Sequence, residues 1–216
     1  MRNKKVILIH GYFKNSKDMK DLEKYLIELG YDAISVDLPL TFNEIDIALY
    51  KFENIFKNIV DSFEKGDRVS LVGHSTGGLI IRRFILDNPE YIDLIDRCIL
   101  ISTPNRGSEV ADIVTRYLRI STSIFSTIKS LKTTEVENIN SIDKKHIKIG
   151  AIAGDKDNLI LGRVLSNKND GRVRIESVKY DNLDDFIILP YNHAEIHHKK
   201  ATAKLVDKFI REGKFK

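Results

Sequence analysis

Apolar residues follow two alternating patterns along this chain. Short runs rich in apolar residues, typical of strands buried on both faces of a parallel sheet, occur at 6–9, 33–38, 69–72, 98–101, 147–153 and 186–189. Between them, apolar residues recur every three or four positions, which predicts helices at 17–29, 45–63, 79–86 and 195–210. Strands that alternate with helices predict an α/β fold, with a mostly parallel central sheet, helices on both faces and right-handed crossovers.

One segment, 108–145, departs from this alternation. It contains two predicted helices, at 110–118 and 124–136, and is longer than a crossover between neighbouring strands requires. The segment is expected to be either a small helical lid or a pair of helices that cover the sheet edge. The full length, 1–216, suits one domain with a complete core, so we expect a single domain with the helical insertion at 108–145.

The third predicted strand ends in Gly73-His74-Ser75-Thr76-Gly77, which has the pattern Gly-x-Ser-x-Gly. Between a strand and a helix, this pattern is typical of a nucleophile elbow, a sharp turn that strains the serine backbone and exposes its hydroxyl. Glycine is needed two residues before and two after Ser75, because side chains there would collide across the turn. Thr76 opens the helix, so its N–H lacks an intrahelical partner and can donate to an oxyanion. The sequence therefore predicts Ser75 as the nucleophile.

Ligands of a parallel sheet covered on both faces bind beyond the carboxyl ends of its strands. The segments His10–Gly11 and Thr103–Pro104 each follow a predicted strand, as do Ser75 and Asp155. We therefore expect all four to lie along one edge of the sheet, which predicts a site at that edge.

A serine hydroxyl is a poor nucleophile until a base accepts its proton, and that base needs an acid to fix its tautomer. His193 lies between the last predicted strand and the last predicted helix, so it is the candidate base. Of two candidate acids, Asp155 directly follows a strand and Asp170 lies in a later loop; spacing alone leaves both open. His197 and His198 are expected within the last helix, facing away, and no metal site is expected.

Motifs along nearly the whole chain resemble those of lipases and esterases with the α/β-hydrolase fold. The matching segments are Ile9-His10-Gly11-Tyr12, the elbow at 72–78, the segment 102–108, Asn169-Asp170-Gly171-x-Val173 and Leu189-Pro190-x-x-His193. The resemblance implies that Asp170 is the acid, with Asp155 as the alternative. It also implies that the backbone N–H of Tyr12 joins that of Thr76 in an oxyanion hole, and that His74 is structural.

The resemblance and the chain order of the motifs together predict a carboxylic ester hydrolase. Ser75, His193 and Asp170 would form its catalytic triad and work through an acyl-enzyme, with no metal or organic cofactor. The expected substrate is a small-molecule or lipid ester. Two alternatives remain: an acyltransferase that uses the same acyl-enzyme, and a non-catalytic binding protein on the same fold.

Composition and charge narrow the possible partners. With 35 basic and 31 acidic residues the net charge is +4, and no basic run contains interleaved aromatic residues, so no nucleic-acid partner is expected. The single cysteine, Cys98, fits a reducing compartment and a cytoplasmic location. The apolar run near the start is too short for a signal peptide, and no later stretch approaches the length needed for stable membrane insertion.

Overall fold

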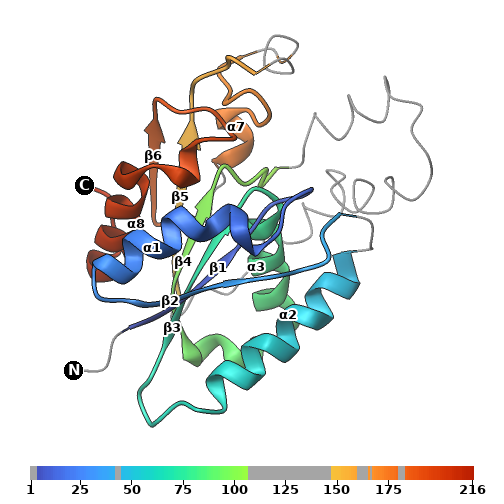
Figure 1. Cartoon of the computed structure of the whole chain (residues 1–216), viewed down its shortest axis with the longest axis vertical. Helices are drawn as coiled ribbons and strands as arrows, with labels where there is room; N and C mark the ends of the chain where they lie inside the picture. Colours follow the sequence, from blue (N-terminus) through green and yellow to red (C-terminus); the bar gives the residue numbers. More distant parts are fainter. Residues whose placement is uncertain (1–3, 42–44, 107–146, 160–164, 166, 180–182) are drawn as a thin grey trace.

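The structure, a computed structural model, describes residues 4–41, 45–106, 147–159, 165, 167–179 and 183–216 (Figure 1). The helical insertion expected at 108–145 lies outside the described residues. The described part of the chain forms a six-stranded sheet with the strand order β2-β1-β3-β4-β5-β6, and each of its pairings is parallel. The strands are β1 (Lys5–Ile9), β2 (Asp32–Val36), β3 (Val69–His74), β4 (Ile95–Ile101), β5 (Lys148–Gly154) and β6 (Asp185–Leu189). The predicted parallel sheet is confirmed.

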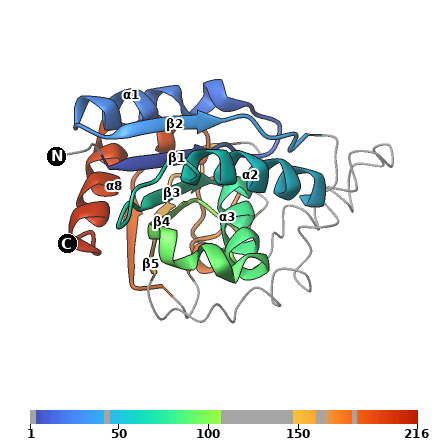
Figure 2. The ribbon, with the colours of Figure 1, turned by 90° about the horizontal axis from the view of Figure 1, so that it is seen from below.

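Helices cover both faces of this sheet, as the alternating pattern predicts (Figure 2). One face carries α1 and α8, and the other carries α2 and α3. The α-helices are α1 (Lys20–Glu28), α2 (Ile45–Val60), α3 (Thr76–Asp87), α7 (Ile175–Val178) and α8 (Lys200–Glu212). Short 3₁₀ helices complete the described elements: η1 (Ser16–Met19), η2 (Pro89–Leu94) and η5 (Ile196–His198).

Successive residues of β1 show how the two faces are built. Val6 and Leu8 pack in the core under α1 and α8, whereas Ile7 and Ile9 pack in the core under α2 and α3. All four are fully buried, because side chains alternate between the faces of a strand and both faces are covered. Burying each such side chain contributes about 1.5–3 kcal/mol, so β1 is firmly fixed and the loop after Ile9 starts from a rigid base.

The last predicted helix differs from the structure in one respect that affects the site. The pattern at 195–210 predicts one continuous helix, but the structure has the 3₁₀ turn η5, then Lys199 with an extended backbone (φ −84°, ψ 134°), and then α8. Because of this break, the side chains of η5 do not continue the helical pattern of α8. His197, in η5, is only 1% exposed. The expectation that His197 faces away is therefore wrong.

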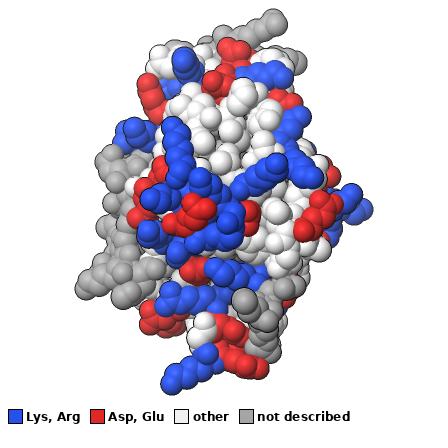
Figure 3. Space-filling model, turned by 90° about the vertical axis from the view of Figure 1, so that its left-hand side faces the viewer, with Lys and Arg blue, Asp and Glu red and all other residues white. Residues whose placement is uncertain are grey.

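Positive and negative side chains are mixed on the surface that carries α8 and α1 (Figure 3). Several form ion pairs one helical turn apart, including Arg211 with Asp207 (2.7 Å) and Lys20 with Glu23 (2.6 Å). Such pairs between side chains three or four positions apart stabilise the helices that carry them. Among the residues that the structure describes, no helix combines the length and the apolar character needed to cross a bilayer.

Candidate active site

Ser75 is the single residue that joins β3 to α3. Its backbone has φ 52° and ψ −122°, a conformation that costs a non-glycine residue about 1–3 kcal/mol. Two hydrogen bonds hold it there: its N–H donates to the carbonyl of Ile101 at the end of β4 (2.8 Å), and its carbonyl accepts from Gly78 (3.0 Å). The strained turn that the Gly-x-Ser-x-Gly pattern predicts is present.

The two glycines that flank this turn leave no room for a side chain. A Cβ at Gly73 would lie 2.5 Å from backbone atoms of Gly77 and Gly78, across the turn. A Cβ at Gly77 would lie 2.4 Å from the carbonyl oxygen of Ile9 and 2.6 Å from that of His10. The obstacle at Gly77 is therefore the end of the neighbouring strand β1. Both glycines let α3 pack closely against the sheet directly behind Ser75.

The loop after β1 lies against the same turn. A Cβ at Gly11 would be 3.0 Å from the Cβ of Ser75, so the segment that continues into Tyr12 passes directly beside the serine. His10 shapes this loop: its Nδ1 donates to the carbonyl of Gly11 (2.9 Å) and its Nε2 accepts from the N–H of Leu38 (3.1 Å). Burial lowers the pKa of His10, which favours this neutral, doubly bonded imidazole.

Asp170 and His193 form a buried hydrogen-bonded pair. The Nδ1 of His193 lies 2.9 Å from the Oδ2 of Asp170, and the two side chains are 3% and 0% exposed. The Oδ1 of Asp170 accepts from the N–H groups of Arg172 (3.0 Å) and Val173 (2.8 Å). Burial alone would raise the pKa of Asp170, but His193 and the N–H of Val173 outweigh it and lower that pKa below its usual range. The carboxylate is thus ionised and fixes the tautomer of the imidazole.

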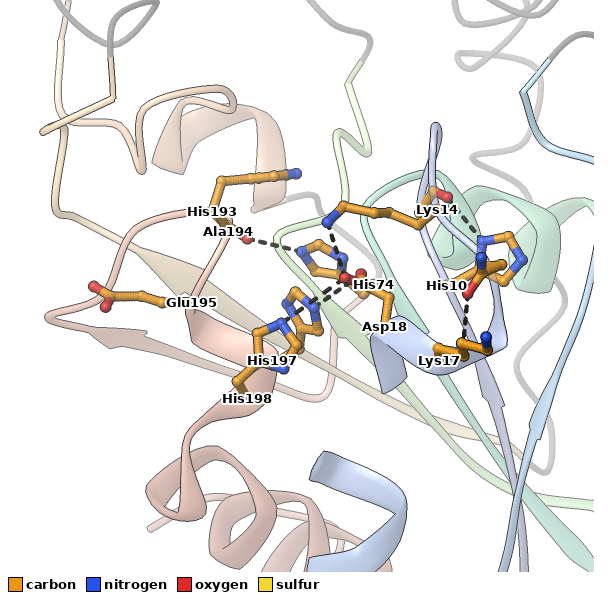
Figure 4. Close-up of polar contacts among 12 residues, drawn as sticks. His10, Lys14, Lys17, Asp18, His74, His193, Ala194, Glu195, His197 and His198 are labelled. Atoms are coloured by element: carbon orange, nitrogen blue, oxygen red, sulfur yellow. Dashed lines mark hydrogen bonds and ion pairs between the residues drawn. The ribbon is translucent and has the colours of Figure 1, made fainter. Parts of the chain in front are cut away.

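The residue before the nucleophile connects this pair to the elbow. The Nε2 of His74 lies 3.1 Å from the carbonyl oxygen of His193 (Figure 4). The rings of the two histidines have centroids 4.9 Å apart. Since His74 directly precedes Ser75, the structure brings His193 and Asp170 to the elbow at the carboxyl end of β3.

Comparison with known structures identifies the fold. A lipase from Bacillus licheniformis, BlEst2 in its mature form, superposes with a TM-score of 0.77 at 19% identity, covering 97% of this chain and 91% of the lipase. The chain covers only 50% of the propeptide form of BlEst2. The metagenomic carboxyl esterase MGS0156 superposes with a TM-score of 0.78 at 12% identity, covering 99% and 77% of the two chains. This chain has the α/β-hydrolase fold.

Three further comparisons complete this picture. Est1E from Butyrivibrio proteoclasticus, solved with ferulic acid bound, has a TM-score of 0.67 at 17% identity, covering 98% of this chain and 88% of Est1E. The profile of the family described as "Putative serine esterase (DUF676)" matches residues 2–101, a range that includes Ser75. No curated protein sequence matches the chain significantly. The resemblance to lipases and esterases of this fold is confirmed.

The alternative acid, Asp155, lies at the end of β5 but points to solvent. Its side chain is exposed, whereas that of Asp170 is fully buried. The N–H of Asp155 donates to the carbonyl of Leu189 (3.1 Å), so its backbone helps to hold the end of β6. Of the two candidate carboxylates, Asp170 is the one that the structure pairs with His193.

A second group of polar side chains, which the sequence does not predict, lies behind the elbow. His197 stacks on His74 with ring centroids 3.8 Å apart, and its Nε2 lies 3.0 Å from the Oδ2 of Asp18 (Figure 4). Asp18 also pairs with the Nζ of Lys14 (3.0 Å). The sequence holds one signal of this group, which is that His197 follows His193 by four residues. If the segment is interpreted as a continuous helix, that spacing places His197 on the surface.

These side chains are also the best candidates for metal ligands among the described residues. Ligand atoms of Asp18, His74 and His197 lie within 4.8 Å of one another. Two of these atoms, the Nε2 of His197 and the Oδ2 of Asp18, already form a hydrogen bond with each other (3.0 Å), and the ammonium of Lys14 lies against the same carboxylate (3.0 Å). Direct hydrogen bonding accounts for this group better than a metal does.

A hollow of about 920 Å³ lies at the opposite end of the sheet. Residues at or next to the amino ends of four strands line it, among them Lys5, Asp32, Arg68 and Asp96. Its charges are mixed in sign, and ligands of α/β sheets bind at the carboxyl ends of strands. The hollow is therefore separate from the Ser75 site.

Proposed function

We propose that this α/β-hydrolase cleaves carboxylic esters, with Ser75 as nucleophile, His193 as general base and Asp170 as the acid that orients it. The observation that carries the proposal is the buried Asp170–His193 pair held against the strained serine turn. The match to a profile described as a serine esterase, and the structural likeness to a lipase and a carboxyl esterase, support it.

The first half of the reaction forms an acyl-enzyme. The Oγ of Ser75 attacks the ester carbonyl carbon while the Nε2 of His193 takes its proton, and the carbonyl π electrons move to the oxygen. Asp170 stabilises the imidazolium through its hydrogen bond to Nδ1. The tetrahedral intermediate then collapses, the bond to the alcohol oxygen breaks, and His193 returns the proton to the departing alcohol. Water repeats these steps on the acyl-enzyme and releases the acid.

Negative charge on the tetrahedral oxygen requires donors in front of Ser75. The N–H of Thr76, the first residue of α3, lies at a helix N-terminus, where backbone donors lack intrahelical partners and the helix dipole favours negative charge. The N–H of Tyr12, in the loop that passes beside Ser75, is the proposed second donor. Each such donor is worth about 3 kcal/mol of transition-state stabilisation.

Covalent labelling tests the proposal. An alkyl fluorophosphonate should react at the Oγ of Ser75 with loss of fluoride, and the wild type should hydrolyse p-nitrophenyl acetate. In Ser75→Ala, labelling should disappear and kcat should fall on the order of 10⁴–10⁶-fold. Ser62→Ala, which alters an exposed serine after α2, is the matched control and should behave as the wild type. Equal labelling of wild type and Ser75→Ala would refute the assignment.

The substrate class can be tested with the same protein. A series of p-nitrophenyl esters from acetyl to palmitoyl, each with and without detergent, compares soluble and lipid-like substrates. A kcat/KM that rises with acyl length identifies a lipid ester as the preferred substrate class, and a maximum at acetyl identifies a small-molecule ester. Turnover of none of these esters by the wild type would contradict the proposed ester hydrolysis.

A further inference from the structure

His193 lies in a loop between β6 and η5, and its main support comes from another loop. Its N–H donates to the backbone carbonyl of Asp170 (2.8 Å), and its imidazole donates to the carboxylate of the same residue (2.9 Å). Two loops that hold each other can shift together relative to the strand that carries Ser75. The hydrogen bond from His74 to the carbonyl of His193 ties the pair to that strand.

The tautomer of His74 follows from this contact. A carbonyl oxygen only accepts, so the Nε2 of His74 must carry the proton and its Nδ1 must be bare. The ring is 3% exposed, and its Nδ1 has no hydrogen-bond partner among the described residues. Burial, together with neighbouring His197 and His193, lowers the pKa of His74 well below its ordinary value, so the ring stays neutral.

His197 supports the ring of His74 from the other side. The two imidazoles are stacked at 3.8 Å with an angle of 26° between their planes. The Nε2 of His197 donates to the carboxylate of Asp18 (3.0 Å), which fixes the tautomer and rotation of this ring. Burial lowers the pKa of His197 despite the nearby carboxylate, so the stack consists of two neutral rings.

Asp18 accepts the hydrogen bond from His197, and it lies in a different part of the chain from both histidines. It lies in η1, close after β1, and its side chain is 8% exposed. Burial opposes its charge, but hydrogen bonds from His197 and Lys14 outweigh it and hold its pKa well below the usual range. The neighbouring His198 contacts Asp21 (2.8 Å) and remains partly exposed. The carboxylate of Asp18 is therefore a permanent acceptor for His197.

We propose that Asp18, His197 and His74 form a positioning relay that fixes the backbone of His193 relative to the Ser75 strand; this inference rests on the proposed function. None of the three touches substrate in this proposal. The relay acts on the distance between the imidazole of His193 and the Oγ of Ser75. A displacement of about 1 Å at reacting groups can cost roughly 10²-fold in rate, so loss of the relay should lower kcat.

Paired substitutions at His74 test the relay directly. His74→Leu keeps the volume but removes the donor, whereas His74→Gln places an amide N–H near the position of Nε2. We expect kcat for p-nitrophenyl acetate to fall about 10–100-fold in His74→Leu, with KM within about threefold of the wild type. His74→Gln should recover most of that loss. Tyr31→Phe, which removes a hydrogen bond to Asp207 in α8 (2.8 Å) and touches no member of the relay, is the control and should change kcat less than about threefold.

A second readout separates positioning from a general loss of structure. In His74→Leu, the proton resonance of the His193 Nδ1–H bonded to Asp170 should persist in the NMR spectrum while fluorophosphonate labelling slows in parallel with kcat. Should His74→Leu fail to fold, Asp18→Ala and Asp18→Asn provide the same comparison. The amide oxygen of Asn can still accept from His197, so Asp18→Asn should retain more activity than Asp18→Ala.

Several results would overturn the relay while leaving the proposed function intact. One is a wild type that is labelled at Ser75 together with a His74→Leu variant labelled at the same rate. Another is equal activity of Asp18→Ala and the wild type. Loss of activity on dialysis against EDTA, restored by Zn²⁺, would assign the same side chains to a metal instead. A wild type that resists labelling altogether would count against the serine hydrolase proposal itself.

Discussion

Replacing Asp170 by asparagine is the sharpest test of the acid, because the structure dictates how the amide must lie. The Oδ1 of Asp170 accepts two backbone N–H groups, from Arg172 and Val173, and Oδ2 accepts from His193. In Asp170→Asn, the amide oxygen must take the place of Oδ1. The opposite rotamer would face the NH₂ group against two buried donors, at about 1–3 kcal/mol for each unsatisfied group.

The NH₂ group of the asparagine then faces the Nδ1 of His193. Since NH₂ only donates, His193 is driven to the tautomer whose proton is on Nε2, the nitrogen that must accept the proton of Ser75. The base is therefore blocked although the fold is unchanged. Loss of catalysis should be on the order of 10⁴-fold in kcat, equivalent to about 5 kcal/mol at the transition state.

Steady-state hydrolysis of p-nitrophenyl acetate measures this loss, with thermal unfolding as a check that Asp170→Asn is folded. Asp155→Asn is the matched control, since it makes the same chemical change in an exposed carboxylate at the end of β5. It should retain activity within about threefold of the wild type. A larger loss in Asp155→Asn than in Asp170→Asn would refute the reasoning.

Two further predictions concern the elbow and the buried histidines. Gly77→Ala forces a Cβ to within 2.4 Å of the Ile9 carbonyl and should cost about 3 kcal/mol, lowering the unfolding midpoint by roughly 6–12 °C; an unchanged midpoint would contradict the packing argument. Burial lowers the pKa values of His74 and His197, so below about pH 6.5 the unfolded chain binds more protons than the folded chain. The contribution of these two histidines to stability should therefore be complete above that pH and decrease as the pH drops. In His197→Phe the unfolding midpoint should fall less steeply with decreasing pH. Equal slopes of the midpoint against pH in His197→Phe and the wild type would exclude this linkage.

Features that depend on neighbouring residues could be predicted from the sequence. The elbow is one of them, since the Cβ of residue 73 would collide with the backbone only four and five residues later. The six strands are another, because burial on both faces makes each a short run of apolar residues. The start of α3 is predicted by the elbow motif and not by periodicity: the apolar pattern begins only at 79, since the residues before it are small, whereas the motif places the first helical residue at Thr76, where the structure has it.

Features that depend on distant residues could not be predicted. The contact between Asp18 and His197 joins positions 179 residues apart, and no local pattern encodes it. The burial of His197 depends on one extended residue, Lys199, which interrupts an otherwise helical pattern. Spacing alone likewise leaves Asp155 and Asp170 open; the resemblance implies Asp170, and the structure pairs that residue with His193.

Two features with a local energetic cost, a strained backbone and a charge removed from water, meet at the same edge of the sheet. Ser75 keeps a backbone conformation that costs about 1–3 kcal/mol. Asp170 keeps a negative charge at 0% exposure, which is tolerable only because three hydrogen bonds compensate for the lost water. A structural role at either position could be filled without strain or charge. Their coincidence beside His193 is expected where a hydroxyl must be exposed and an imidazole must become charged, and this is the physical reason to place acyl chemistry here.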